Sequence, residues 1–526
     1  MIGYGRTLGA AMRKKPRGAA VPLIALDRKA EKPLHRQIYD ALRAMILERR
    51  LLPDQQIPST RALADELRIS RIPVLGAYAQ LLAEGYIESR SGAGTFVTST
   101  LSDRFLSVRP AVASAVNDAA TDAISRVSRL LPLEGTPWFL GSGAFSVGQI
   151  AYDHFPFRVW SDLVTYHARR VRTSSMNYSD PMGSKEFREA IAAYLRTARA
   201  VHCDASQIMV VNGSQHALDL SARVLLDPDS PVWIEEPGYV FLRHTLTLSG
   251  CRLVPVPVDS EGLDVAAGVQ LSPNARVAFV TPSHQYPLGA TMSVARRLQL
   301  LEWAHSSGGW IVEDDYDSEY RYESMPVASM QGLDSGQGLD SGHGPDPGSR
   351  VIYIGTFSKT LFPALRLGYI VIPPALVNRF QAVRQANDLC PSHLYQAALA
   401  DFISGGHFAR HVRKTRQLYA ERRNALALTL RNEFGSEIEI LGAEAGMHLV
   451  VTLPPGLSDQ KISARAAQAG LWLWPLSAAY AGTDVRQGFI LGFGGTRADE
   501  MIHQVRRLRR AVRDESGYEG EHRSGH

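Results

Sequence analysis

The sequence is poor in cysteine and has no long apolar segment. Its three cysteines, Cys203, Cys251 and Cys390, are odd in number, lie far apart and form no Cys-x-x-Cys pair. This argues against a disulfide framework and a structural zinc site, so we expect no metal and a reducing, cytoplasmic location. No apolar run reaches the roughly 18 residues of a membrane-spanning helix, and we expect no membrane contact. The basic residues 1–32 precede no apolar stretch, so we interpret them as a disordered N-terminus and not as a signal peptide.

The composition is that of an ordinary globular protein. Of the 526 residues, 45% are hydrophobic and 21% are charged. At about 100–200 residues per domain, this length predicts about three units. The net charge of +5 is unevenly distributed, since residues 1–110 hold 18 Lys and Arg against 10 Asp and Glu. Such a basic segment indicates either a polyanionic partner for the first part of the chain or a solvated surface.

Residues 33–98 have the pattern of a small helical unit with a hairpin. Apolar side chains recur at helical spacing over residues 34–51. Ser59 and Ser70 stand where the N-caps of two further short helices are expected. Small residues at 91–94 then join two strand-like segments, which predicts a β-hairpin. Three helices and a hairpin predict an α+β winged helix-turn-helix.

Three further segments lack apolar periodicity. Residues 99–134 are rich in Ala, Ser, Asp and Arg, and we interpret them as a linker that spans about 30 Å as a flexible coil. Residues 331–349 carry a short duplication and much Gly, Asp and Ser, which predicts a disordered insertion. We expect the tail, residues 514–526, to be disordered as well.

Residues 135–513 alternate between strand-like and helix-like segments. The strand-like segments IMVVNG, VWIEEP, RVAFVTP, WIVEDD and VIYIGTF are short and rich in Val and Ile. Amphipathic helical stretches separate them. This alternation predicts an α/β domain with a mostly parallel sheet covered by helices.

A lysine follows one of these strands in the segment GTFSKTLFPALRLGY. Lys359 stands just after an apolar strand and beside small hydroxyl residues. Partial desolvation at a strand end lowers the pKa of a lysine amine and makes it a nucleophile that forms Schiff bases. Thr356, Ser358 and Arg366 supply hydroxyl and cationic donors suited to a phosphate. The alternative is a solvated lysine on a surface loop.

An acidic cluster ends another strand, in the segment WIVEDDYDSEYRY. A pyridoxal-type cofactor needs one carboxylate against its ring nitrogen, and Asp314 or Asp315 is suited to that role. Tyr316 is then a donor to the ring oxygen. The alternatives are a solvated acidic loop and a metal site. A metal is disfavoured because no histidine is near in sequence, and isolated histidines such as His284 are more typical of packed or exposed side chains than of ligands.

The third motif is MVVNGSQHALDL, in which a strand turns into a helix at Asn-Gly-Ser. The free N–H groups at such a helix start bind phosphate. Gly213, Ser214 and Gln215 are therefore candidate phosphate ligands. The signal is weak by itself, because strand-Gly-helix turns are common in α/β folds.

Taken together, these motifs resemble a known family in their order and separation. Residues 175–370 resemble fold-type I aminotransferases, through NYSDPMGSKEF, MVVNGSQHALDL, EEPGY, EDDY and SKTLFPALRLGY. The resemblance implies a large domain with a mostly parallel sheet and a small C-terminal α/β subdomain. It also implies pyridoxal 5′-phosphate (PLP) as the cofactor.

The same resemblance implies a role for each motif residue. Lys359 would form the Schiff base and is the one catalytic residue that we expect. Asp314 would pair with the pyridine nitrogen, Tyr316 with the ring oxygen, and Tyr239 would stack on the ring. The phosphate would be bound by the other residues of two motifs, namely Gly213, Ser214, Gln215, Thr356, Ser358 and Arg366.

Three further assignments come from the resemblance. Tyr178 matches a residue that reaches the phosphate from the neighbouring subunit. Many aminotransferases have Asn-Pro-Thr-Gly where this chain has Gln285-Tyr286-Pro287-Leu288-Gly289, so the asparagine that usually contacts the ring oxygen is absent or replaced. We expect Tyr286 to contact the cofactor. The arginine that binds a substrate carboxylate in this family matches either Arg486 or Arg497.

Residues 33–98 resemble GntR-type winged helices, through PLHRQIYDALRAMIL, IPSTRALADELRISR and AYAQLLAEGYIESRSGAGTFV. In that family the second and third helices and the wing approach duplex DNA. The residues placed there are Ser59, Arg61, Ser70, Arg71, Arg90, Ser91 and Gly92. The chain departs from the family inside the recognition helix, where Ile72-Pro73 replaces the usual Asn-Thr and Gly76 stands at a position that is often basic.

The order of winged helix, linker and aminotransferase-like domain resembles the MocR-type subfamily of GntR regulators. It implies a PLP-dependent transcription regulator that binds operator DNA as a head-to-tail homodimer and senses a small amino compound through the Lys359 aldimine. Two alternatives remain: a working aminotransferase with a DNA-binding appendage, and a repressor that uses the large domain only as a scaffold.

Overall fold

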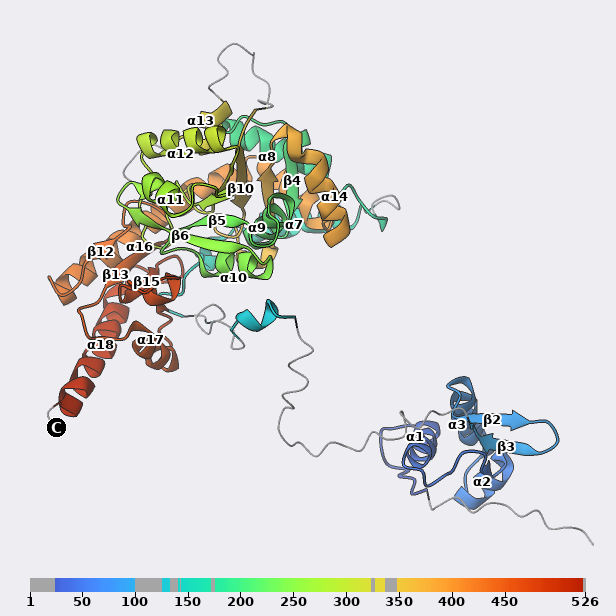
Figure 1. Ribbon diagram of the computed structural model, residues 1–526. Coiled ribbons are helices and arrows are strands. Elements are labelled where there is room, and N and C mark those ends of the chain that lie inside the picture. The colour runs from blue at the N-terminus through green and yellow to red at the C-terminus, as the bar shows by residue number, and fades with distance from the viewer. Residues whose placement is uncertain are drawn as a thin grey trace, which may run out of the picture. The chain divides into compact units, whose positions relative to one another are not determined.

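The computed structural model contains two compact units, Met1–Ala123 and Ile124–His526. It describes residues 24–99, 125–132, 141, 143–171, 176–322, 327–335 and 348–523, and each unit is considered by itself (Figure 1). No helix within these described ranges is long and apolar enough to cross a membrane.

The N-terminal unit is a winged helix-turn-helix, as the sequence predicts. Its helices are α1 (Leu34–Leu47), α2 (Thr60–Leu67) and α3 (Arg71–Ala83). Its strands are β1 (Gln56–Ile57), β2 (Ile87–Arg90) and β3 (Gly94–Val97), in the order β1-β3-β2. The predicted hairpin is therefore part of a three-stranded sheet. The sequence did not indicate β1, because two residues are too short to show an alternating pattern.

Order in this unit begins before residue 33, which corrects the predicted boundary. Ile24 is 8% exposed and belongs to the core formed by the three helices and the wing. The Gln37 side chain accepts a hydrogen bond from the Asp27 N–H and donates to the Asp27 and Lys32 carbonyls. The disordered start therefore does not extend to residue 32. Residues 1–23 lie outside the described residues.

An eight-stranded sheet forms the centre of the second unit, in the order β4-β11-β10-β9-β8-β5-β6-β7. The central pairs β10–β9, β9–β8, β8–β5 and β5–β6 are parallel, whereas β11 runs antiparallel to both β10 and β4. The strands are β4 (Ile208–Val211), β5 (Pro231–Glu236), β6 (Arg252–Asp259), β7 (Gly262–Leu263), β8 (Val277–Val280), β9 (Trp310–Asp315), β10 (Val351–Thr356) and β11 (Gly368–Val371). The mostly parallel sheet that the sequence predicts is confirmed.

Helices cover both faces of this sheet (Figure 1). Alternate residues of one strand join different cores: Ile208 and Val210 pack in one cluster, and Met209 and Val211 in another. Such two-sided burial explains why the strands are continuous apolar runs. The surrounding helices are α7 (Phe157–Ala168), α8 (Lys185–Ala198), α9 (Ser214–Leu225), α10 (Val240–Leu248), α11 (Val265–Leu271), α12 (Val294–Ser307), α13 (Met330–Ser335), α14 (Val377–Asn387) and α15 (Leu394–Ser404).

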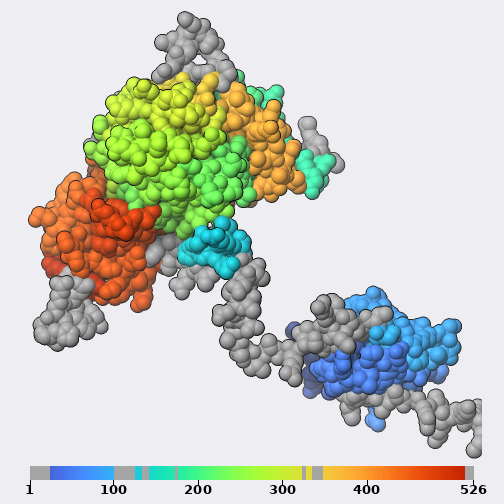
Figure 2. Space-filling model, viewed as in Figure 1, coloured from blue at the N-terminus to red at the C-terminus, as the bar shows by residue number. Residues whose placement is uncertain are grey.

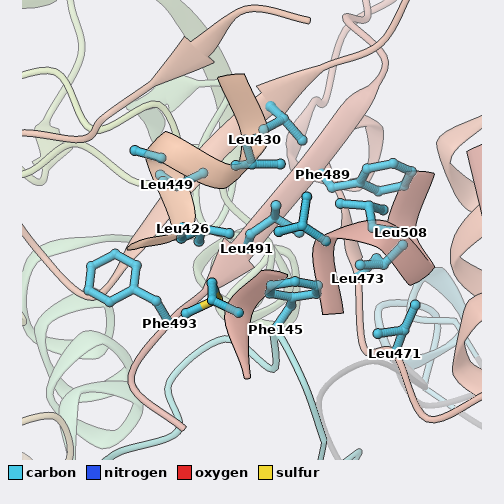
Figure 3. Packing of buried hydrophobic residues seen from close by; sticks show 14 of the residues in the cluster. Phe145, Leu426, Leu430, Leu449, Leu471, Leu473, Phe489, Leu491, Phe493 and Leu508 are labelled. Atoms are coloured by element: carbon cyan, nitrogen blue, oxygen red, sulfur yellow. The ribbon is translucent and has the colours of Figure 1, made fainter. Parts of the chain in front are cut away.

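A smaller C-terminal subdomain has a four-stranded antiparallel sheet in the order β12-β13-β15-β14. The strands are β12 (Ile440–Leu441), β13 (His448–Thr452), β14 (Trp474–Pro475) and β15 (Gly488–Gly492), with α16 (His407–Phe434), α17 (Asp459–Gln468) and α18 (Met501–Arg523). Figure 3 shows its core, in which Phe145 packs among leucines of α16, α18 and the sheet. In Figure 2 the red part of its surface adjoins the green surface of the large subdomain.

Two segments that the sequence predicts to be disordered are partly helical. Residues 331–335 belong to α13, where Gln331 and Asp334 are buried, so the insertion does not begin at 331. Residues 514–523 continue α18, and Glu515 is 4% exposed and paired with Arg465 at 2.5 Å. The sequence did not predict these two helices because their segments are poor in apolar residues. Buried polar side chains attach them to the rest of the unit instead. Residues 336–347, 524–526 and most of the 99–134 linker lie outside the described residues.

Candidate functional site

The motif residues of the second unit meet at one edge of the large sheet. β4, β5, β8, β9 and β10 run in the same direction, so their carboxyl ends lie together. Gly213 follows β4, Tyr239 follows β5, Tyr286 follows β8, and Lys359 follows β10. Open α/β sheets bind their ligands at this edge.

Lys359 is partly buried there, and its backbone carbonyl lies 3.5 Å from the Tyr320 hydroxyl. Burial lowers the pKa of the Lys359 amine, while the nearby carboxylates of Asp317 and Asp314 oppose that shift. The amine also fills the space beside Gly148, where an added Cβ would come within 2.4 Å of Nζ. A lowered pKa leaves more of the amine unprotonated, and the unprotonated amine is the nucleophile.

Asp314 and Asp315 are neighbours in sequence but have different surroundings. Arg199 holds Asp315 at 2.6 Å with both side chains almost fully buried, and the Tyr353 hydroxyl donates to the same carboxylate. Asp314 instead lines an apolar pocket with Tyr239, and its buried Oδ1 has no hydrogen-bond partner in the described part of the chain. Burial, with Asp315 and Glu235 nearby, raises the pKa of Asp314 to about 7.

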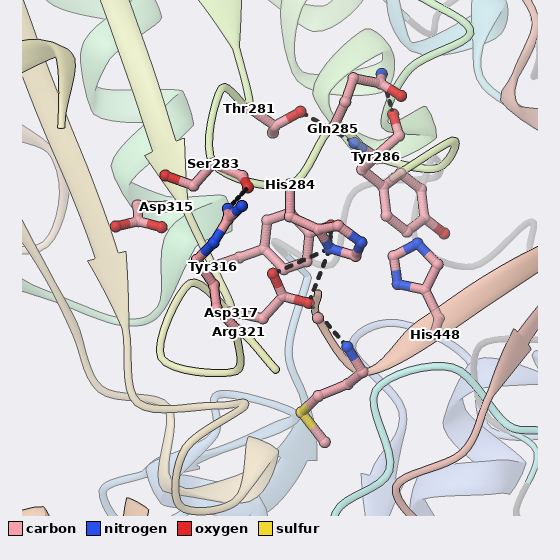
Figure 4. A network of polar contacts seen from close by, with 12 residues as sticks. Thr281, Ser283, His284, Gln285, Tyr286, Asp315, Tyr316, Asp317, Arg321 and His448 are labelled. Carbon is pink, nitrogen blue, oxygen red and sulfur yellow. Dashed lines mark hydrogen bonds and ion pairs between the residues drawn. The ribbon is translucent and has the colours of Figure 1, made fainter. Parts of the chain in front are cut away.

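Next to Asp314, the Tyr316 hydroxyl lies in a polar network (Figure 4). It is 3.0 Å from His284 Nδ1, which is also 3.2 Å from both carboxylate oxygens of Asp317. His284, Asp317 and His448 are all buried and offer ligand atoms within 4.8 Å of one another. Sequence reasoning missed this cluster because its members come from three distant segments. Burial also lowers the pKa of His448 to about 3, which keeps that ring neutral.

Two further tyrosines lie beside Asp314 and Tyr316. The Tyr239 and Tyr286 rings make an edge-on contact, with 5.6 Å between their centroids. Tyr286 is 8% exposed and its ring centroid is 5.3 Å from that of His448. Burial raises the pKa values of both phenols, so each remains a hydroxyl donor at neutral pH.

The predicted phosphate ligands form a second group at this edge. Gly213 has φ +83° and precedes α9, and a Cβ there would lie 3.2 Å from the Arg366 guanidinium. Arg366 donates to the Asn212 carbonyl at 2.7 Å, and the Thr356 and Ser358 hydroxyls are 3.1 Å apart. Ser214 is the first residue of α9, so its N–H lies in the first turn, where backbone donors lack helical partners.

Gln215 does not join this group in the way the motif suggested. Its amide nitrogen donates to the Phe241 carbonyl at 3.0 Å and to the Thr245 hydroxyl. The amide therefore ties α9 to α10. Its oxygen is buried and has no hydrogen-bond partner in the described part of the chain.

Three other predicted residues lie at the surface. Tyr178 is 80% exposed. Arg486 pairs with Glu439 at 2.6 Å, and Arg497 forms a two-point contact with Asp499 at 3.0 and 3.1 Å. Both arginines are exposed and already paired, so this geometry favours neither as a carboxylate ligand.

In the N-terminal unit, the candidate DNA-binding residues lie around the junction of α2 and α3. Ser59 caps α2, its hydroxyl accepting the Ala62 N–H at 3.1 Å. Ser70 precedes α3 without a side-chain cap bond. Arg61 and Arg71 are exposed, and Arg71 Nε donates to the Thr60 hydroxyl at 3.0 Å, which links the two helices.

The wing is less available than the sequence suggested. Arg90 pairs with Asp54 and with Glu88 and lies over the Phe96 ring at 4.6 Å. Its charge is therefore partly neutralised within the unit. Ser91 and Gly92, with φ +72° at Gly92, form the exposed tip.

Comparison with known proteins matches both units to families. Residues 34–97 match the family model described as bacterial regulatory proteins, gntR family. Residues 144–489 match the model of aminotransferase class I and II.

The relatives include full-length regulators and solved enzymes. The chain is 41% identical to "Probable rhizopine catabolism regulatory protein MocR" of Rhizobium meliloti, over 93% of this chain and 96% of that one. The kynurenine aminotransferase of Pyrococcus horikoshii in complex with PMP is similar to 76% of this chain and 99% of its own, with TM-score 0.67 and 27% identity. The α-aminoadipate aminotransferase LysN of Thermus thermophilus, complexed with N-(5′-phosphopyridoxyl)-L-leucine, covers the same shares with TM-score 0.68 and 25% identity.

Proposed function

Because this chain belongs to the MocR-type branch of the GntR family of bacterial transcription regulators, we propose that it controls transcription in response to a small amino compound that reaches Lys359. Similarity to a regulator along 93% of the chain, with both units included, favours this function over an independent aminotransferase. A DNA-binding regulator of this kind acts in the cytoplasm.

We propose that PLP is the resident cofactor, and the residues fit it. The strongest support is Asp314, a buried carboxylate whose Oδ1 has no hydrogen-bond partner in the described chain and which faces a pocket lined by Tyr239. A protonated ring nitrogen satisfies such an oxygen. When bound, PLP supplies a carbonyl that amines attack and a ring that withdraws electrons.

Each group of the cleft has a distinct task in this proposal. Asp314 holds the proton of the ring nitrogen, and Asp315, occupied by Arg199, keeps the end of β9 in place. With PLP bound, Tyr239 would cover one face of the ring and Tyr316 would donate to the ring oxygen. Lys359 presents an amine that burial keeps ready to react.

The phosphate site is proposed at the start of α9. The backbone N–H groups from Ser214 onward are oriented as anion donors, and Gly213 leaves room because it has no side chain. Arg366 adds a cation beside that turn, and the hydroxyls of Thr356 and Ser358 complete the group.

We propose that the protein acts as a homodimer, with Tyr178 reaching the phosphate site of its partner. Tyr178 is 80% exposed, and Met176 beside it is 78% exposed, which leaves two large side chains for a partner to cover. A dimer also presents two winged helices, so it needs two DNA half-sites. A head-to-tail arrangement belongs to the same proposal.

A spectrum tests the cofactor assignment directly. The purified protein supplied with PLP is expected to show the visible absorption of a lysine-bound cofactor, and adding an effector amine is expected to shift it. If the chain folds but never acquires visible absorption, the large unit is only a scaffold and the proposal is wrong.

A further inference from the structure

The Tyr316 hydroxyl contacts a buried histidine, which in turn contacts a buried aspartate, and none of the assignments above includes these two side chains. His284 Nδ1 lies 3.0 Å from this hydroxyl and 3.2 Å from both oxygens of Asp317. His284 and Asp317 are each 2% exposed, so water does not compete for these contacts. His284 Nε2 is buried and has no hydrogen-bond partner in the described part of the chain.

We assign the imidazole proton of His284 from its two contacts. An ionised carboxylate only accepts hydrogen bonds, so Asp317 requires the N–H of His284 at Nδ1. The Tyr316 oxygen then shares that N–H as a second acceptor. Its own O–H hydrogen is left free to point elsewhere, toward the proposed ring oxygen of the cofactor.

Two glycines pack closely against this imidazole. A Cβ at Gly446 would come within 2.1 Å of the His284 ring, and one at Gly289 within 3.0 Å of Nε2. Both glycines have positive φ, +73° and +77°. Asp317 also accepts the Met447 N–H at 3.1 Å, just before β13, so the arrangement joins the large subdomain to the C-terminal one.

We infer that Asp317 and His284 are positioning residues that make Tyr316 a hydrogen-bond donor to the ring oxygen of the bound cofactor. The Met447 N–H makes the C-terminal subdomain part of the same arrangement. This inference rests on the proposed PLP site and adds two residues to it.

The test uses full-length holo-protein and three substitutions: His284→Asn, Asp317→Asn and Tyr316→Phe. Each of the first two is expected to shift the visible absorption maximum while the PLP content stays near that of the wild type. Neither is expected to cause a further shift in the Tyr316→Phe background, because the effect passes through that hydroxyl. His305→Asn is the matched control. His305, on α12, forms a similar pair with Asp334 of α13 at 2.6 Å.

An unchanged maximum in a folded Asp317→Asn protein overturns the inference, as does a shift that persists without the Tyr316 hydroxyl. Asp317→Asn preserves the size of the side chain, so it still tests the inference if the His284→Asn protein does not fold. A wild-type protein without visible absorption instead makes the proposed cofactor wrong.

A separate observation concerns the N-terminal unit. Ile72 is 79% exposed in the first turn of α3, between Arg71 and Pro73, and Leu75 on the same face is 43% exposed. In a helix-turn-helix the first turn of the second helix faces the base edges of the major groove. The apolar group displayed there is the methyl group of thymine.

We infer that Ile72 packs against a thymine methyl group and thereby selects A·T pairs at one position of each half-site. This rests on DNA binding by the winged helix and specifies its sequence preference. The neighbouring Arg61 and Arg71 supply the positive charge that brings the helix to the DNA.

The probe is a duplex selected by the full-length protein from a random library, with each thymine replaced in turn by deoxyuridine, which lacks the methyl group. Wild-type affinity is expected to fall about fourfold at the contacted position, the effect of one buried methyl group. Ile72→Ala is expected to bind the thymine and uracil forms equally there. Leu82→Ala, which removes a 41% exposed side chain of the same helix, is expected to keep the wild-type difference.

Equal wild-type binding to every uracil duplex overturns this inference, and so does an Ile72→Ala protein that still distinguishes the two forms. If no duplex is selected even at low salt, the DNA-binding function itself is wrong.

Discussion

The two units of this chain present their functional side chains in opposite ways. In the winged helix, Ser70, Arg71 and Ile72 are consecutive and exposed at the start of one helix. In the aminotransferase-like unit, Asp314 lies in β9 and Lys359 follows β10, so the two meet at the carboxyl edge of the large sheet, where both are at least partly buried. A surface that binds a polyanion needs only locally ordered, charged side chains. A site that lowers the pKa of an amine must bury that amine, and burial requires a large core.

The comparison predicts that the two functions can be separated by substitution. The largest expected effect is that of Lys359→Ala, which should remove the visible absorption of the holo-protein completely. Binding to DNA at low salt should remain, because the winged helix has its own core. Absorption spectra and a gel shift on the same preparation measure both. An unchanged visible spectrum would refute the assignment of Lys359.

The neighbours Asp314 and Asp315 should separate cofactor binding from stability. Asp315→Asn breaks a buried ion pair with Arg199 and should lower the free energy of unfolding by about 3–5 kcal/mol. Asp314→Asn should instead weaken PLP binding about ten- to a hundredfold, the loss of one charge-assisted hydrogen bond. Denaturant unfolding and PLP titration of both proteins measure this. If Asp315→Asn weakens PLP more than Asp314→Asn does in folded protein, the assignment is one residue off.

The free energy of unfolding of the apo-protein should depend on pH through the ionisation of Asp314. Its pKa is raised from 3.8 to about 7 in the folded protein, so the folded state holds a proton that the unfolded state loses. Stability is therefore highest below pH 4 for this group and declines as the pH rises to 7. Relative to Asp314→Asn, the wild type should lose on the order of 3–4 kcal/mol over that range. If the free energies of unfolding of the two proteins change with pH in the same way, the pKa of Asp314 is not raised.

The smallest expected effect is on DNA binding by the winged helix. Arg71→Ala should weaken DNA binding about tenfold and reduce the slope of log affinity against log salt by about one, without changing the visible spectrum or the melting temperature. Arg50→Ala removes the same charge from a pair with Glu48 and serves as the control. If the two substitutions weaken DNA binding equally, Arg71 contributes only its positive charge and makes no specific DNA contact.

The same contrast explains what the sequence could predict. The helices of the winged unit, its Ser59 cap and the mostly parallel character of the large sheet follow from patterns within a few residues. The strand-end motifs likewise identified Asp314, Tyr316 and Lys359 as candidates. The sequence could not show that Arg199 occupies Asp315 or that His284 meets Asp317, because these contacts depend on how distant segments pack.

Polar contacts account for the other differences. The buried Glu515 and Asp334 hold helices in segments whose composition is typical of disorder. Arg90 is taken up by Asp54 and Glu88 in the wing, although its position in the motif predicted a DNA contact. Apart from Glu88, the partners of these charged groups lie far from them in sequence.

The central claim is that an amino compound acts on DNA binding through Lys359. It is tested most directly by footprinting the promoter region of the chain's own gene with wild-type and Lys359→Ala proteins, each with and without amines that shift the wild-type spectrum. We predict that such an amine changes the wild-type footprint and leaves that of Lys359→Ala unchanged. An identical amine response of both proteins, or no footprint by either at low salt, contradicts the claim.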